Sequence, residues 1–312
     1  MGTPPMLLKK YCVWCLCIFW LWGLPILCLA QELEPRRWSH LPTGANFAGA
    51  GYAYTEADIS FDPVLRIENG KMELHTWAAR YIRTFELFEK SARIDLVQAY
   101  QRGRWHGLVN DVPKSVRRGG LSDSLLRFAI NLYGASPLKG KEFAAYRAKV
   151  DVETIVGTAL VVQLPTGEYK DGKLINLGTN RYTFRPQLGV VHNRGNWSME
   201  LTGEVYIYMD NNDFYNGNKL ENDPFYTLQT NLVYTFRPGL WAAAGAGFGY
   251  GGQSTVNGEK KNDRRENLGW TFSFGYPITP QLGVKVGYLG IRSQKSVGQD
   301  SDSIAVAFSF FW

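Results

Sequence analysis

The feature that most constrains this chain is a two-residue alternation of apolar and polar side chains, which is strongest at the C-terminal end. Between residues 303 and 312, one face carries Ile304, Val306, Phe308, Phe310 and Trp312. The opposite face is serine and alanine except at Phe311. The same alternation occurs in residues 197–208, 226–236, 268–276 and 282–288. Because side chains of a β-strand point to alternate faces, the sequence predicts an all-β fold.

Two classes of all-β protein produce such alternation. A soluble sandwich turns its apolar faces inward, whereas a membrane barrel turns them outward. The barrel is favoured because the apolar faces are aromatic toward the strand ends, as lipid-interface girdles are. The opposite faces carry glycine, small polar and charged residues, which suit a wet lumen wall. After residue 30, no apolar run is long enough for a helical membrane span.

The spacing of the candidate strands also favours a barrel. The candidate strands are 45–55, 73–85, 91–102, 121–133, 153–164, 180–192, 196–208, 225–237, 240–251, 265–276, 281–292 and 302–312. Long connections, such as 103–120 and 252–264, alternate with short ones, such as 193–195 and 238–239. Outer-membrane barrels combine long external loops with short periplasmic turns in this way. We therefore predict a single transmembrane antiparallel β-barrel of about 12 strands that covers residues 45–312.

Two places fit this scheme less well. The connection 137–151 should be a short periplasmic turn, yet it is long and contains helix-forming residues at 141–149. We predict a short helical cap there, with a miscounted strand as the alternative. In the second strand, either Arg80 or Arg83 must face outward unless a β-bulge intervenes.

The first 30 residues have the pattern of a secretory signal peptide. Lys9 and Lys10 precede an apolar run over 11–29, and small residues at Cys28 and Ala30 predict cleavage after Ala30. An uncleaved anchor is the alternative, although Pro25 interrupts the run. The four cysteines all lie within these residues, which excludes a disulfide framework or a cysteine metal site in the remainder. We expect residues 31–44 to form a periplasmic N-terminal segment that either hangs free or plugs the pore.

Several segments together resemble a known family. These are residues 41–54 with 61–63, 120–134, 164–167 and 182–189. They are similar to the outer-membrane transporter family named for the MetA pathway of phenol degradation. The resemblance spans roughly residues 41–312 and implies a monomeric-type barrel of Gram-negative bacteria. It also implies passage of small organic solutes, with aromatic ones as one option.

The closing residues resemble those of bacterial outer-membrane proteins more generally. The terminal Trp312 follows aromatic residues at alternate positions. In that group, such an end carries the signal for the barrel-assembly machinery. We therefore expect this machinery, outer-membrane lipid, lipopolysaccharide and a small organic solute as partners, and no nucleic acid.

If the apolar faces meet lipid, charged residues of the opposite faces point into the lumen. The inward candidates are Arg93, Asp95, Arg127, Asn131, Arg181, Arg185, Glu200, Glu204 and Lys285. The inward assignment is favoured because an Arg or Lys facing mid-bilayer lipid costs about 2–4 kcal/mol. The functional interpretation is a charged eyelet, with Arg181 and Arg185 opposite glutamates of the next strand, that screens solutes. The alternative is a structural network that fills a narrow barrel.

Other candidate sites carry less chemistry. A basic external cluster of Arg102, Arg104, His106, Lys114, Arg117 and Arg118 could attract anionic solutes, bind lipopolysaccharide phosphates or simply be solvated. The segment 210–218 fails the calcium-loop pattern, which predicts a flexible external loop. No histidine has a serine two residues later and no nucleophile elbow occurs, so we expect no enzyme, metal or cofactor. The predicted function is a solute channel. A closed structural or loop-binding barrel is the alternative, and a lipid-modifying enzyme is a third reading.

Overall fold

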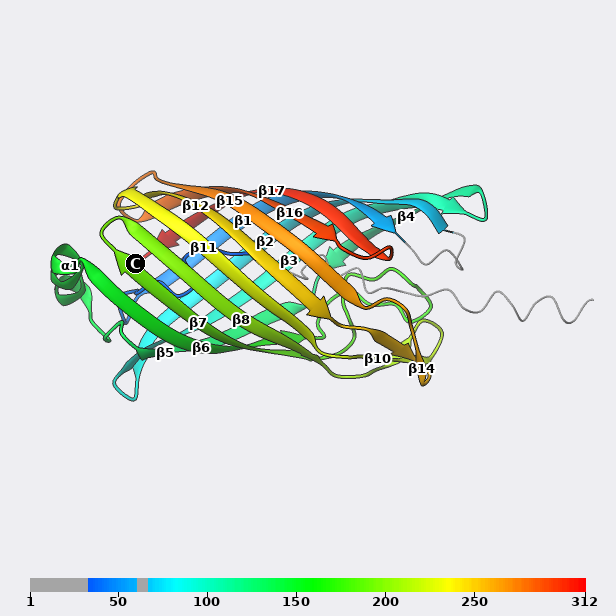
Figure 1. Ribbon diagram of the computed structural model, residues 1–312, viewed down its shortest axis with the longest axis horizontal. Helices are drawn as coiled ribbons and strands as arrows, with labels where there is room; N and C mark the ends of the chain where they lie inside the picture. Colours follow the sequence, from blue (N-terminus) through cyan, green and yellow to red (C-terminus); the bar gives the residue numbers. More distant parts are fainter. Residues whose placement is uncertain (1–32, 61–66) are drawn as a thin grey trace, which may run out of the picture.

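The chain folds into one closed antiparallel β-barrel (Figure 1). The structure, a computed structural model, describes residues 33–60 and 67–312. The barrel strands are β1 (Asn46–Ser60), β2 (Ile67–Leu87), β3 (Lys90–Val109), β5 (Ser124–Tyr133), β6 (Val152–Leu164), β7 (Thr183–Arg194), β8 (Trp197–Tyr208), β11 (Phe225–Arg237), β12 (Leu240–Gly251), β15 (Arg265–Pro277), β16 (Leu282–Ser293) and β17 (Gly298–Phe311). β1 closes the cylinder by pairing with both β2 and β17. The predicted fold class is thus confirmed.

One predicted loop is instead a strand hairpin. β3 continues to Val109, and β4 (Val112–Leu121) returns along it, so the predicted loop 103–120 is wrong. The two residues of its turn, Asn110 and Asp111, have φ values of 50° and 61°. Asparagine and aspartate tolerate this left-handed conformation, which two-residue hairpin turns require. β4 is therefore a thirteenth strand that extends the wall beyond the closed cylinder.

The external loops also contain a small second sheet. β9 (Asn211–Phe214), β10 (Asn218–Asn222), β13 (Ser254–Val256) and β14 (Glu259–Lys260) form four antiparallel strands in the order β14-β13-β10-β9. These strands lie within the predicted loops after β8 and β12. Residues 210–218, expected as a flexible loop, thus carry paired strands.

The predicted helical cap is confirmed as α1 (Gly140–Lys149), which lies at the same end of the barrel as the C-terminus (Figure 1). The rings of Phe143 and Tyr146 contact the ring of His40 with centroids 5.0 and 5.3 Å apart. Tyr146 donates a hydrogen bond to Glu153 over 2.9 Å, and burial together with this bond raises the pKa of Tyr146. In the described residues, no helix is long and apolar enough to cross a bilayer.

The outer wall is apolar and the inner wall is polar, as the alternation predicts. Exposed side chains include Leu228, Phe272, Ile304 and Phe308, whereas their strand neighbours Thr227 and Thr271 are buried. This distribution is that of a barrel standing in lipid rather than in water.

The structure shows which arginine of β2 faces outward, and no β-bulge lies next to either Arg80 or Arg83. Arg80 points inward, and Arg83 points outward at the rim. Arg83 there donates hydrogen bonds to the Gly44 carbonyl oxygen and to Asn46 Oδ1, each over 3.0 Å. The outward arginine thus binds polar groups at the barrel's end and does not stand in mid-bilayer lipid.

Candidate functional site: the lumen

The lumen contains a stretch of the chain that precedes the first strand. We call residues 33–43 the lumen segment. Leu33, Arg37, Trp38 and His40 are all buried, although none belongs to a strand or helix. Of the two placements left open by the sequence for residues 31–44, the described part lies among lumen side chains. The predicted signal peptide falls on residues outside the described ranges.

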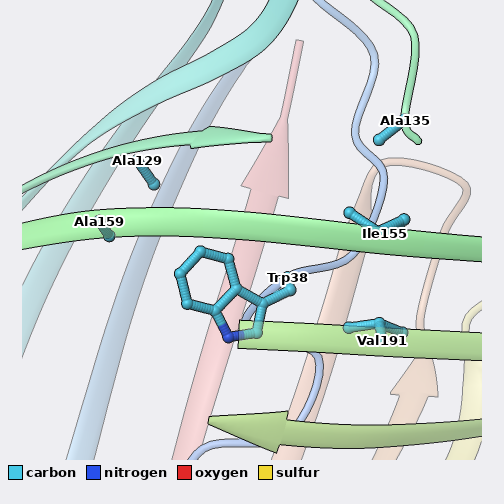
Figure 2. Close-up of a cluster of buried hydrophobic side chains, with 6 residues drawn as sticks. All are labelled: Trp38, Ala129, Ala135, Ile155, Ala159 and Val191. Carbon is cyan, nitrogen blue, oxygen red and sulfur yellow. The ribbon is translucent and has the colours of Figure 1, made fainter. Parts of the chain in front are cut away.

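Trp38 is the main apolar anchor of the lumen segment. Its side chain is 2% exposed and sits among Ala129, Ala135, Ile155, Ala159 and Val191 (Figure 2). Its indole Nε1 donates a hydrogen bond to Thr202 Oγ1 over 2.8 Å. The guanidinium of Arg127 lies 4.9 Å from the ring centroid.

Two glycines make room for this indole. A Cβ added at Gly157 would lie 2.6 Å from the indole Cε3. A Cβ added at Gly189 would overlap the indole nitrogen. Real Cβ atoms do not approach so closely, so the ring rests on bare backbone of β6 and β7. The glycines at these two positions are therefore part of the seat for Trp38.

Asp95 is the centre of one charged cluster. Its carboxylate is 1% exposed and lies within 4.0 Å of three guanidinium groups. The separations are 2.7 Å to Arg80 Nη2, 3.3 Å to Arg93 Nε and 3.5 Å to Arg127 Nη1. One carboxylate thus faces three positive charges, so other residues must supply further negative charge or hydrogen-bond acceptors.

The lumen segment supplies part of that compensation. Glu34 lies 2.9 Å from Arg80 Nη1 and 3.5 Å from Lys285 Nζ. The backbone carbonyl of Arg37 accepts a hydrogen bond from Arg93 Nη2 over 2.7 Å. The lumen segment is therefore held by charge as well as by the packing of Trp38.

A second cluster forms on β7 and β8, beyond β6 in the wall, and a hydrogen bond from Arg127 Nε to Gln187 Oε1 over 3.0 Å joins it to the first. Arg185 Nε donates to Glu204 Oε1 over 2.6 Å, and Gln187 Nε2 donates to the same oxygen over 2.9 Å. Both Glu200 carboxylate oxygens accept from the backbone N–H of Arg36, at 2.9 and 2.8 Å. Arg185 and Glu204 are thus a pair within the wall, while Glu200 binds the lumen segment.

Arg181 differs from the other lumen arginines. It is 3% exposed, and its guanidinium lies 4.7 Å from the ring centroid of Tyr208. No carboxylate of the described residues lies within 4.0 Å of it. Thr183 Oγ1, on the same face of the chain, is buried without a hydrogen-bond partner. The predicted arrangement of two arginines opposite two glutamates is therefore not what the structure shows.

The remaining candidates also face inward. Asn131 donates a hydrogen bond to Ser91 Oγ over 2.8 Å. Next to it, a cavity of about 20 Å³ separates the lumen segment from the wall, lined in part by Trp38, Arg93 and Asn131. This is room for about one water molecule.

Sequence reasoning missed several residues that join this network. They are Glu34, Arg36, Arg37, Trp38 and Arg80. Arg80 could have been named as a candidate, because the alternation of β2 places either Arg80 or Arg83 in the lumen. The residues of the lumen segment carried none, since no periodic pattern precedes β1.

Asp123 fixes the loop between β6 and β7. Its carboxylate accepts hydrogen bonds from the backbone N–H of Gly167 and Thr179, each over 2.9 Å. It also accepts from Thr179 Oγ1 over 2.6 Å and from Gln163 Nε2 over 2.9 Å. One buried carboxylate thus holds both ends of the loop at the end of the barrel that carries the long loops.

These contacts describe a polar, hydrogen-bonded interior. Among residues 33–60 and 67–312, no group of three or more His, Cys, Asp and Glu side chains could hold a metal ion. The chemistry that the lumen offers is recognition by charge, by hydrogen bonding and by guanidinium–aromatic stacking.

Comparison with solved structures found the following similarities. The COG4313 outer membrane channel from Pseudomonas putida F1 is similar with a TM-score of 0.76 and 20% identity, over 90% of this chain and 100% of that chain. The transport unit of the Escherichia coli autotransporter AIDA-I gives 0.48 and 8%, over 90% and 92%. The CymD monoaromatic hydrocarbon channel gives 0.43 and 8%, over 87% and 89%.

Comparison with curated protein sequences found no match. Comparison with protein families gave a match over residues 42–305, which is most of the barrel. The resemblance noted in the sequence is therefore confirmed. The chain is an outer-membrane-type β-barrel, and it belongs to the family described as "Putative MetA-pathway of phenol degradation".

Proposed function

We propose that this protein is an outer-membrane channel for passive or facilitated diffusion of small organic solutes. The observation that carries the proposal is the lumen segment. It fills a polar lumen through ion pairs, hydrogen bonds and one indole, with no strand pairing to the wall. A segment held in this way can leave the lumen without breaking the hydrogen bonds between the barrel strands. The name "channel" given to the similar Pseudomonas protein is in keeping with this function.

Export follows from the same proposal. We infer cleavage of a signal peptide after Ala30, which leaves 32 basic and 28 acidic residues in the mature chain, a net charge of +4. Trp312 is the proposed recognition point for the barrel-assembly machinery. Its backbone N–H and C=O pair with Asn46 across the closing seam. Because the ring of Trp312 is exposed at the seam, the assembly machinery would bind it before the barrel closes.

The proposed lumen-lining residues are the nine inward candidates predicted from the sequence. When the lumen segment leaves, Glu200 loses its backbone donor and Lys285 loses Glu34. These side chains then become free to meet a passing solute. Arg181 is held on Tyr208, a residue of the wall, rather than by the lumen segment.

A closed structural barrel is the second candidate, and the buried state of the lumen segment favours it. Planar-bilayer recordings and liposome swelling separate the two functions. A channel predicts current and swelling with small solutes, and both increase when residues 33–43 are deleted. Stable insertion without current or swelling, in the intact and the deleted protein alike, contradicts the channel and supports the closed barrel.

The charge selectivity of the lumen has its own test. Arg181→Gln removes an unpaired buried positive charge, so the ratio of anion to cation permeability should fall. Arg83→Gln is the matched control, because Arg83 faces outward at the rim. If reversal potentials under a salt gradient are the same for Arg181→Gln, Arg83→Gln and the wild type, Arg181 takes no part in selectivity.

A further inference from the structure

The hairpin of β3 and β4 carries three exposed arginines on its outer face. They are Arg102 and Arg104 on β3 and Arg117 on β4. Arg104 and Arg117 are directly opposite each other in the strand pairing, and Arg102 is two residues along the same face. In the part of the chain that the structure describes, none of the three lies within 4.0 Å of a carboxylate.

A row of exposed side chains shows where these arginines lie along the barrel axis. Trp77, Tyr100 and Leu121 are all exposed and are consecutive partners across β2, β3 and β4. Exposed aromatic rows mark the edge of the hydrocarbon layer. Two residues of a strand rise about 7 Å along the strand, which is about 5 Å along the axis of a barrel whose strands tilt by about 40°. Arg102 therefore lies about 5 Å beyond this row and Arg104 about 10 Å. The arginines therefore stand at the level of lipid headgroups.

The side of the membrane follows from the loops. The β3–β4 hairpin lies at the end of the barrel away from α1 and the C-terminus (Figure 1). That end also carries the long loops and the second sheet. In barrels of this class, long loops are external. The headgroups that meet the hairpin are thus those of the outer leaflet.

The charges on this face are only partly compensated by residues of the neighbouring strands. Like charges directly opposite in a sheet are destabilising, as Arg104 and Arg117 are. Glu73 of β2 is the pairing partner of Arg104 on its other side, but the two side chains form no ion pair. The acidic residues Glu56 and Asp302 follow in the same row on β1 and β17, farther from Arg117. The β3–β4 side of this row is therefore positive and faces outward.

We propose that Arg102, Arg104 and Arg117 form a binding site for the phosphate groups of lipopolysaccharide. A guanidinium presents two parallel N–H groups that match phosphate oxygens, and phosphate supplies the negative charge that this pair lacks. The acyl chains of the same lipid would lie along the exposed row of Trp77, Tyr100 and Leu121. The site thus accounts for both the charged and the apolar part of one lipid.

The structure separates these arginines from the other basic residues of the hairpin. Arg118 lies on the inner face, where its Nε donates to the Ile175 carbonyl oxygen over 2.9 Å. Lys114 lies on the same inner face of β4, four residues nearer to the hairpin turn. The basic cluster seen in the sequence is therefore two sets, and only the outward set is in reach of the membrane.

The test is lipid binding by the purified full barrel. Native mass spectrometry in detergent would follow titration with hexa-acylated lipid A carrying two phosphates, one phosphate or none. Each basic residue near an anionic surface contributes about a factor of five. The variant Arg102→Gln, Arg104→Gln, Arg117→Gln should therefore weaken binding of the bis-phosphate form by about 100-fold. The variant with lysine at the three positions should keep most of the binding.

A matched control removes the same charge from other exposed positions, namely Lys114→Gln, Lys170→Gln and Lys260→Gln. It should bind as the wild type does. Binding that ignores the phosphate count, or that falls equally in both glutamine variants, would overturn the proposal. Displacement of lipid A by millimolar free pyrophosphate alone would also overturn it, because the site would then select phosphate rather than the lipid.

This inference is independent of solute passage. The triple arginine variant should give the same current and swelling as the wild type, since none of the three side chains faces the lumen. A protein that binds lipid A but passes no solute would refute the channel and leave the lipid site standing.

Discussion

Replacing Trp38 with alanine should release the lumen segment. The indole is almost fully buried, donates one hydrogen bond to Thr202 and lies beneath the Arg127 guanidinium. Truncation of a buried tryptophan to alanine typically costs about 3–5 kcal/mol. Because the segment is not part of a strand, this cost acts on its seating rather than on the barrel. At about 1.4 kcal/mol per factor of ten, the released fraction should rise by at least about 100-fold.

The chain offers a clean reporter for this change. All cysteines precede residue 29, so Ser39→Cys would carry the only thiol once a signal peptide is removed. The rate at which a maleimide labels this thiol in the folded barrel measures how often the lumen segment opens. Trp38→Ala should raise this rate in proportion to the released fraction, and single-channel recordings should show longer open periods.

A second perturbation approaches the same contact from the wall. Gly189→Ala places a Cβ on the indole nitrogen and should have the effect of Trp38→Ala. Gly203→Ala is the matched control, because a Cβ there meets nothing within 4 Å. Labelling rates that are the same in all four proteins would refute the claim that the indole holds the segment in place.

Two further predictions concern buried carboxylates. Asp95→Asn leaves Arg80, Arg93 and Arg127 without their shared carboxylate, so it should destabilise the barrel by about 3–5 kcal/mol in urea titrations followed by heat-modifiable mobility. Asp300→Asn, at an exposed position, should change stability by less than about 0.5 kcal/mol, and equal effects would argue against the cluster. Asp123→Ala removes three hydrogen bonds that hold the loop 165–182, so trypsin should cleave at Lys170 or Lys173 faster than in the wild type. Unchanged cleavage would show that other contacts hold this loop.

The sequence was sufficient for the barrel itself. Faces such as that of Ile304, Phe308 and Phe310 can be recognised within a single strand, because lipid selects every second side chain. The helix at 140–149 was visible for a similar reason, since its signal is local composition. Local signals of this kind do not depend on which strands become neighbours.

The features that the sequence did not disclose depend on distant partners. The strands β4, β9 and β10 are short or polar and gain their order by pairing at the loop-bearing end. Glu34 meets Arg80 across 46 positions and Lys285 across 251, and no sequence pattern links such residues. The arrangement predicted for the eyelet failed because of the strand register. β7 and β8 pair Val191 with Glu200 and Thr183 with Tyr208, so Arg181 lies beside Tyr208, far along the strands from Glu200.

The hairpin of β3 and β4 leaves one strand edge exposed. In the described chain, β4 pairs with β3 alone, and only its last residue, Leu121, accepts a backbone hydrogen bond from the loop residue Glu168. An unpaired edge invites a strand from another molecule, which is a route to aggregation. Pro113 removes one donor from this edge, and Lys114, Arg117 and Arg118 would repel the same strand of a second copy. The barrel can thus extend its wall beyond the membrane without offering neighbouring copies a template to join.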